Sequence, residues 1–158
     1  DEKRFKQWQS CIAHVPQNIF IADTSIAENI ALSIEKEKID MDLIKKVSQM
    51  AQLDDFITSL PGKYETELGE RGSRISGGQQ QRIGIARALY KKPKLMIFDE
   101  ATNALDDETE KSIIETINNL SNKITIISIS HKLSILKNCD TIIEMKNGTI
   151  KEIKTEII

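Results

Sequence analysis

Short apolar runs alternate with longer amphipathic segments along the later part of the chain. The runs Leu95–Phe98 and Ile124–Ser130 are rich in apolar residues and too short for helices, which predicts buried strands. Helices are predicted over Ser76–Tyr90 and Asp107–Leu120, and in the second of these isoleucines recur on one side. Because buried strands separated by helices usually pair in parallel, we expect an α/β fold with a mainly parallel sheet flanked by helices.

The earlier part of the chain combines one strand with several short helices. Cys11–Val15 is an apolar run that stops at Pro16, which predicts a buried strand. Three helices are expected after it, over Thr24–Leu32, Asp40–Ala51 and Leu53–Leu60. Thr24 or Ser25 would cap the first helix, with Glu28 in its first turn.

A short helix and a hairpin are expected near the end of the chain. The helix would cover Leu133–Lys137. The segment Thr141–Ile153 contains two strand-like runs around Asn147-Gly148, a pair that favours a type I′ turn.

Composition excludes several classes of protein. With 158 residues, 39% apolar and 29% charged, the chain can form one domain with a buried core. A net charge of −2 and a pI near 5.8 argue against a nucleic-acid partner. Cys11 and Cys139 are far apart and fit no metal spacing, which favours a reducing compartment. The apolar runs are too short to span a bilayer. The chain starts at "DEKRFKQWQ" without Met, which indicates a piece of a longer protein.

The stretch "LMIFDE" places two carboxylates at the end of a buried strand. Asp99 and Glu100 would be costly there unless they meet a cation or face water. Asp99 suits Mg²⁺, which prefers oxygen ligands, and Glu100 could orient or deprotonate an attacking water. An ordinary strand end followed by a helix cap would give the same pattern. The motif alone therefore does not distinguish a catalytic metal site from a structural strand end.

The stretch "ISGGQ" begins a helix with two glycines. Ser76 and Gln79 have the spacing of a capping box, which explains a well-capped helix but not the glycines. Gly77 and Gly78 cost about 1 kcal/mol each relative to Ala inside a helix. We therefore interpret them as an opening through which an anion reaches the backbone N–H groups at the positive end of the helix dipole.

Two further polar residues follow predicted strands. His131 ends one strand and Gln17 follows another, at the same expected sheet edge as the two carboxylates. His14 lies inside a strand and is interpreted as structural.

The chain contains no phosphate-binding P-loop of the form G-x-x-x-x-G-K-[ST]: Gly62 alone precedes a lysine, and Ile57 stands where the first glycine would be.

Five segments together resemble the nucleotide-binding domain of ATP-binding cassette (ABC) transporters. "HVPQ" resembles the Q-loop, "ISGGQQQR" the family signature, "LMIFDE" Walker B, "NALD" the D-loop and "ISH" the switch loop, in family order. "SIAENI" and "TELGERG" are similar to exporter-type members. Ile75, Asn103 and Lys132 stand where Leu, Ser and Arg are commoner. The resemblance implies a P-loop NTPase-like ABC ATPase core, truncated at its amino end and lacking Walker A.

The resemblance also implies roles for single residues. Two such domains would pair head to tail around ATP and Mg²⁺. Asp99 and Gln17 would hold the metal, while Glu100 and His131 would be catalytic. The cofactor-binding candidates are Gln17, Ser76, Gly77, Gly78, Gln79 and Asp106, of which the signature residues would reach ATP held by the partner domain.

The family architecture further implies how the chain is organised and where it acts. Residues 19–75 would form a helical subdomain with the pre-signature segment, and residues 76–158 would carry the signature helix, Walker B, D-loop, switch histidine and terminal hairpin. The full-length protein would be a Mg²⁺-dependent, transport-coupled ATPase at the cytoplasmic face of the cell membrane. It would carry a transmembrane domain and export lipid, lipid-linked sugar, peptide or drug-like cargo. Without Walker A, the isolated chain is expected not to hydrolyse ATP.

Two alternatives remain at this point. A DNA-repair or translation-associated ABC ATPase would carry the same signature and Walker B, although the exporter-like "TELGERG" and the acidic pI count against it. A separate module that only completes a partner's ATP site would leave Glu100 and His131 without a nucleotide of their own.

Overall fold

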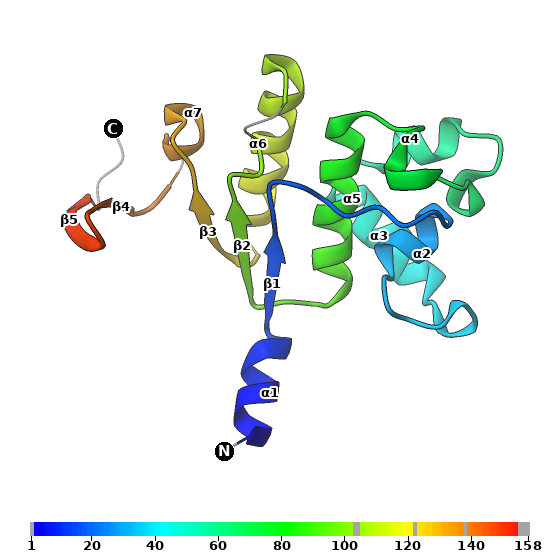
Figure 1. The fold of residues 1–158 in the computed structure, drawn as a ribbon, viewed down its shortest axis with the longest axis horizontal. Helices are drawn as coiled ribbons and strands as arrows, with labels where there is room; N and C mark the ends of the chain where they lie inside the picture. Colours follow the sequence, from blue (N-terminus) through cyan, green and yellow to red (C-terminus); the bar gives the residue numbers. More distant parts are fainter. Residues whose placement is uncertain (1, 103–104, 122, 138, 155–158) are drawn as a thin grey trace.

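A three-stranded parallel sheet forms the centre of the computed structural model, which describes residues 2–102, 105–121, 123–137 and 139–154. Its strands lie in the order β1-β2-β3 (Figure 1). Their bounds are Ile12–Val15 for β1, Leu95–Asp99 for β2 and Thr125–Ile129 for β3. Both pairings are parallel, so the predicted α/β class and parallel sheet are confirmed. The carboxyl ends of all three strands consequently meet at one edge.

The two faces of this sheet have different surroundings. Helices α5 (Gly77–Tyr90) and α6 (Asp107–Ser121) share a buried core with Met96 and Phe98 of β2. Because side chains alternate along a strand, Asp99 belongs to the opposite face. On that face, within the part of the chain that the structure describes, Ile127 and Ile129 are about half exposed.

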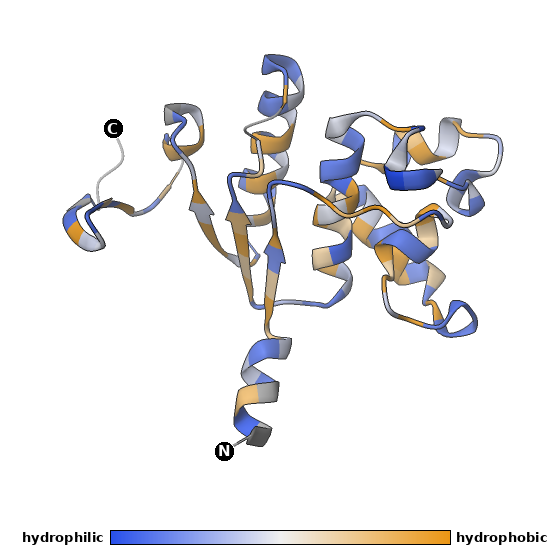
Figure 2. Ribbon diagram, in the orientation of Figure 1, coloured by the Kyte–Doolittle hydropathy of each residue, from blue (hydrophilic) through white to orange (hydrophobic). Residues whose placement is uncertain are grey.

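A group of short helices packs against α5 on the side away from the sheet (Figure 1). They are α2 (Ile26–Ile30), α3 (Met41–Met50) and α4 (Asp54–Ser59), with 3₁₀ turns at Lys36–Lys38, Lys63–Glu65 and Glu70–Gly72. Of the two predicted caps, Thr24 and Ser25, the structure shows Ser25, which forms a capping box with Glu28 of the first turn. Figure 2 shows apolar residues along β2 and alternating apolar and polar bands around the helices, the pattern of elements with one buried side.

Arg82 connects this helical group to the core below it. It lies on α5, and its guanidinium reaches the end of α3 and one side of α6. The acceptors are the Ala51 carbonyl at 3.0 Å, Gln52 Oε1 at 3.3 Å, Thr116 Oγ1 at 3.3 Å and Ser112 Oγ at 2.6 Å. Burial lowers the pKa of Arg82, and these four acceptors are all neutral oxygens. One side chain therefore ties three helices together.

The ends of the described chain extend away from this core. Helix α1 (Glu2–Ser10), which the sequence did not predict, projects from the start of β1; its Phe5 and Trp8 rings stack with centroids 6.2 Å apart and stay mostly exposed. Beyond α7 (Leu133–Leu136), β4 (Ile142–Lys146) and β5 (Thr149–Lys154) pair as the predicted hairpin. Asn147 and Gly148 have φ of 52° and 75°, as a type I′ turn requires.

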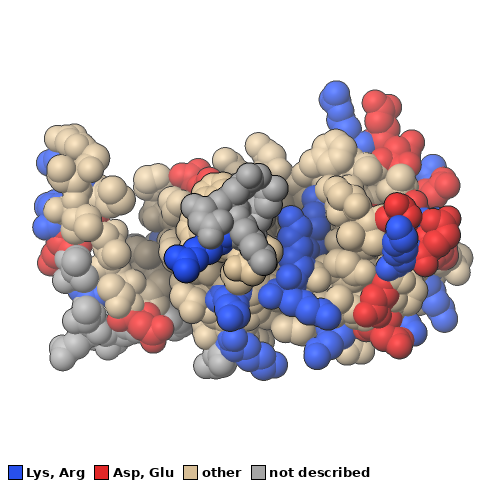
Figure 3. All heavy atoms as spheres, turned by 90° about the horizontal axis from the view of Figure 1, so that it is seen from below, with Lys and Arg blue, Asp and Glu red and all other residues tan. Residues whose placement is uncertain are grey.

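The amino edge of the sheet lies opposite the strand ends discussed below. Figure 3 shows this face, where basic side chains gather near the middle and acidic ones toward the helical group on the right. Within the described residues, none of the helices combines the length and apolarity that crossing a bilayer needs.

Candidate active site at the carboxyl edge of the sheet

The predicted polar residues come together at one edge of the sheet. Gln17 follows β1, Asp99 and Glu100 stand at the end of β2, and His131 follows β3. The pairing of β2 and β3 continues one step further, because the Glu100 backbone N–H donates to the Ile129 carbonyl at 3.0 Å. The parallel register thus brings groups from three distant parts of the sequence to one place.

Glu100 and His131 form the closest contact between catalytic candidates. Glu100 Oε1 lies 3.2 Å from His131 Nε2, although the histidine side chain is 87% exposed and the glutamate side chain 29%. Glu100 has a positive φ of 50°, which is unfavourable for a residue with a Cβ and turns its side chain away from the strand direction. Such strain is typical of positions where a side chain must point in one functional direction.

His14 and Asp99 form a second histidine–carboxylate contact on the open face of the sheet. His14 Nε2 lies 3.7 Å from Asp99 Oδ2, and both side chains are about half exposed. The interpretation of His14 as a structural residue is therefore incomplete, because it lies beside a predicted metal ligand. The sequence signal was its place between two apolar residues of the strand. Ala13 and Val15 face the core, so His14 had to face the other side.

The oxygens at this edge fit Mg²⁺ only in combination with other ligands. Among the described residues there is no cluster of three His, Cys, Asp or Glu side chains that could enclose a metal ion. The half-exposed Asp99 carboxylate and the exposed Gln17 amide do supply oxygen donors. This sparse, open donor set suits Mg²⁺, which keeps waters and substrate phosphates in its coordination shell.

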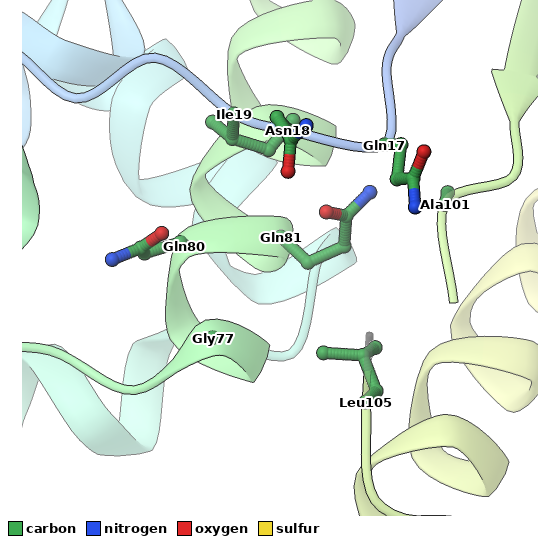
Figure 4. A pocket seen from close by; sticks show the side chains of 8 residues that line it. All are labelled: Gln17, Asn18, Ile19, Gly77, Gln80, Gln81, Ala101 and Leu105. Carbon is green, nitrogen blue, oxygen red and sulfur yellow. The ribbon is translucent and has the colours of Figure 1, made fainter. Parts of the chain in front are cut away.

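A pocket of about 130 Å³ lies between the Q-loop segment and the start of α5. Its lining consists of Gln17, Asn18, Ile19, Gly77, Gln80, Gln81, Ala101 and Leu105 (Figure 4). Gln81, which the sequence analysis did not single out, is 3% exposed and donates from Nε2 to the Pro16 carbonyl at 3.4 Å. Asp99 and Glu100 are not among the lining residues. The polar side chains that line the pocket are all amides, so a ligand there would meet amide donors and acceptors.

The start of α5 has the predicted capping box. The Ser76 N–H donates to Gln79 Oε1 at 2.8 Å, and the Gln79 N–H donates to Ser76 Oγ at 3.3 Å. The two glycines differ in their surroundings. A Cβ on Gly77 would meet Leu105 Cδ2 at an ordinary 3.7 Å, whereas a Cβ on Gly78 would lie 2.3 Å from Thr109 Cγ2. Gly78 is therefore required for the close approach of α5 to α6, whereas Gly77 is not needed for packing at this contact. The predicted roles of both glycines toward a nucleotide remain predictions.

This difference gives a test by substitution. Gly78→Ala should destabilise the complete protein by about 1–3 kcal/mol, because the new methyl overpacks the contact with α6. Thr109→Ser should restore most of that loss, since it removes the clashing methyl but keeps the hydroxyl. Denaturant unfolding measures both effects. Gly77→Ala is the matched control and should leave stability unchanged or slightly raised; an equal loss at both glycines would contradict the packing argument.

Asp106 serves as the cap of α6. Its Oδ1 accepts from the Thr109 N–H at 3.0 Å, and its Oδ2 accepts from the Thr109 hydroxyl at 2.8 Å. These hydrogen bonds, the backbone one first, lower the pKa of Asp106. Its predicted role toward a cofactor remains a prediction. Asn103 of the D-loop lies outside the described residues.

Comparisons with known proteins identify the family of the chain. The family model of the ABC transporter matches residues 1–103. ATP-binding cassette sub-family B member 5 of Homo sapiens is 43% identical over 92% of this chain and 12% of its own length. The ATP-dependent lipid A-core flippase of Saccharophagus degradans is 48% identical over 89% of this chain and 24% of its own length.

A solved structure gives the same result for the fold. The structure of a bacterial Atm1-family ABC exporter with ATP bound superposes with a TM-score of 0.80 at 37% identity, covering 93% of this chain and 25% of that one. The chain thus spans a quarter or less of the length of these relatives. It belongs to the ABC transporter family, as part of a nucleotide-binding domain of the exporter type.

Proposed function

We propose that the chain is part of an ATPase that powers export of a substrate across a membrane. The observation that carries this proposal is the 3.2 Å contact between Glu100 and His131 at the sheet edge that also holds Asp99 and Gln17. Membership of the exporter type supports the transport role over a DNA-repair or translation-associated one.

Within this proposal Glu100 prepares the attacking water. Its carboxylate can accept a hydrogen bond from that water and draw away its proton, and the strained backbone keeps it pointed at one place. His131 is almost fully exposed toward solvent and can donate to a transferring phosphoryl oxygen while it orients Glu100 from 3.2 Å.

Asp99 and Gln17 would hold Mg²⁺ with their oxygen atoms. When bound, this ion neutralises charge on the phosphate oxygens. His14, 3.7 Å from Asp99, would help to fix the orientation of that carboxylate. The β- and γ-phosphates would be held by a P-loop that this chain does not include.

The start of α5 would serve a second nucleotide. Gly77 leaves backbone N–H groups approachable at the positive end of a helix of 14 residues, with Ser76 and Gln79 beside it. In a head-to-tail pair of domains these groups, with Asp106, would face ATP held by the partner. The membrane domain would meet residues 19–75. The lipid named in the description of the flippase makes a lipid the first cargo to test.

Reconstitution of the complete protein in lipid vesicles tests this function. We expect ATP hydrolysis that stops when Mg²⁺ is removed with a chelator and that resumes when Mg²⁺ is restored. ATP should also drive movement of a labelled lipid between leaflets or out of the vesicle. Hydrolysis by a complete protein that has no membrane-embedded part would instead support the non-transport alternative.

A further inference from the structure

An ion pair between the buried Glu110 and the partly exposed Lys132 lies next to the candidate catalytic His131 in sequence. Glu110 of α6 is only 7% exposed, and its Oε2 accepts from the ammonium group of Lys132, the residue that follows His131. Its other oxygen, Oε1, accepts from the Ser134 hydroxyl at 2.8 Å. Both oxygens of this carboxylate are therefore used by the segment after β3.

The same ammonium group also reaches the segment that follows Glu100. Lys132 Nζ donates to the Thr102 carbonyl at 3.2 Å, two residues beyond Glu100. The Lys132 backbone N–H donates to Ser130 Oγ at 3.0 Å, which fixes the loop on the other side of His131. One side chain thus links the two loops that carry the catalytic candidates and anchors both to α6.

This arrangement is more specific than stability alone requires. A buried pair of apolar residues would stabilise such a contact as well as an ion pair does. Here the pair also satisfies a backbone carbonyl and a hydroxyl, which an apolar pair could not do. The pKa of Glu110 is lowered, first by the hydrogen bond from Lys132 and then by that from Ser134, so the carboxylate is charged at neutral pH.

The structure assigns to Lys132, held by Glu110 and the Thr102 carbonyl, the role of a positioning residue that sets the place of His131 relative to Glu100. This inference rests on the proposed ATPase function. His131 needs such support because its own side chain is 87% exposed and contacts Glu100 at its exposed tip. Small displacements at a reacting centre reduce rates strongly even when binding is unchanged.

Steady-state kinetics of the complete protein test the inference. Lys132→Met should lower kcat about tenfold or more and change the Kd for ATP less than about twofold, because positioning, not binding, is lost. Lys132→Arg should restore most of the rate, since it keeps the charge and the donors. Lys111→Met removes an exposed lysine next to Glu110 and is the matched control.

A double-mutant cycle separates positioning from a general structural role. In a His131→Ala background, measured by single turnover, Lys132→Met should lower the rate no more than about twofold further. The same fold loss with and without His131, or an unchanged kcat for Lys132→Met in an active protein, would overturn the inference alone. An inactive wild-type protein would overturn the proposed function and this inference together.

Discussion

Glu100→Gln should lower ATP hydrolysis by the complete protein by about 100-fold or more and leave ATP binding intact. Glutamine has the same shape as glutamate but cannot accept the proton of the attacking water. Its amide can still contact His131, so the position of the histidine 3.2 Å away should persist. Because the nucleotide is bound and not consumed, the variant should accumulate as a closed, ATP-bound pair of domains.

Single-turnover hydrolysis and nucleotide-binding measurements check the two halves of this expectation. Glu115→Gln changes an exposed glutamate on α6 in the same way and should have no effect. An unchanged turnover rate in Glu100→Gln would exclude Glu100 as the base. A parallel loss of ATP binding would assign it to nucleotide binding instead.

Arg82→Met should have the largest effect on stability, about 3 kcal/mol in the free energy of unfolding. The substitution removes the shared donor of four neutral acceptors, two just after α3 and two on α6. Within the described residues, Gln52 Oε1 alone among them keeps another donor, the Ser112 hydroxyl. Arg82→Lys should recover only part of the loss, because an ammonium group cannot reproduce the planar fork of the guanidinium.

Denaturant unfolding of the complete protein measures these changes. Arg74 is the matched control: it is exposed and donates a hydrogen bond to the Glu67 carbonyl at 3.2 Å. Arg74→Met should change stability by no more than about 0.5 kcal/mol. Equal effects at the two arginines would show that Arg82 does not join the helices in the way its contacts indicate.

Most of the fold follows from simple sequence patterns. The apolar runs at Leu95–Phe98 and Ile124–Ser130 correctly predicted strands, β2 and β3. The prediction that the second of these strands is buried was wrong within the described residues, because Ile127 and Ile129 are about half exposed. Once those strands are parallel, their carboxyl ends must share an edge, so the convergence of Asp99, Glu100 and His131 was predictable. Helix α1 was not, because its large apolar residues remain exposed and give no periodic signal of burial.

The contacts inside the site were harder to predict. Both glycines of "ISGG" fit an anion seat equally well in the sequence, and only the three-dimensional approach of Thr109 shows that Gly78 is needed for packing. The contact of His14 with Asp99 depends on the register between β1 and β2, which no local pattern specifies. The pair of Glu110 and Lys132 joins residues 22 positions apart, one on α6 and one after β3, and no local sequence pattern links them.

Ile19, which lines the pocket beside Gln17, also packs against Gly84 of α5, and this contact has a consequence for evolution. A Cβ on Gly84 would lie 2.4 Å from Ile19 Cδ1, so the residue behind the Q-loop and the glycine on the helix occupy one shared space. Neither position can gain volume unless the other gives it up. We therefore expect a larger residue to appear at position 84 only in sequences that already have a smaller residue at position 19.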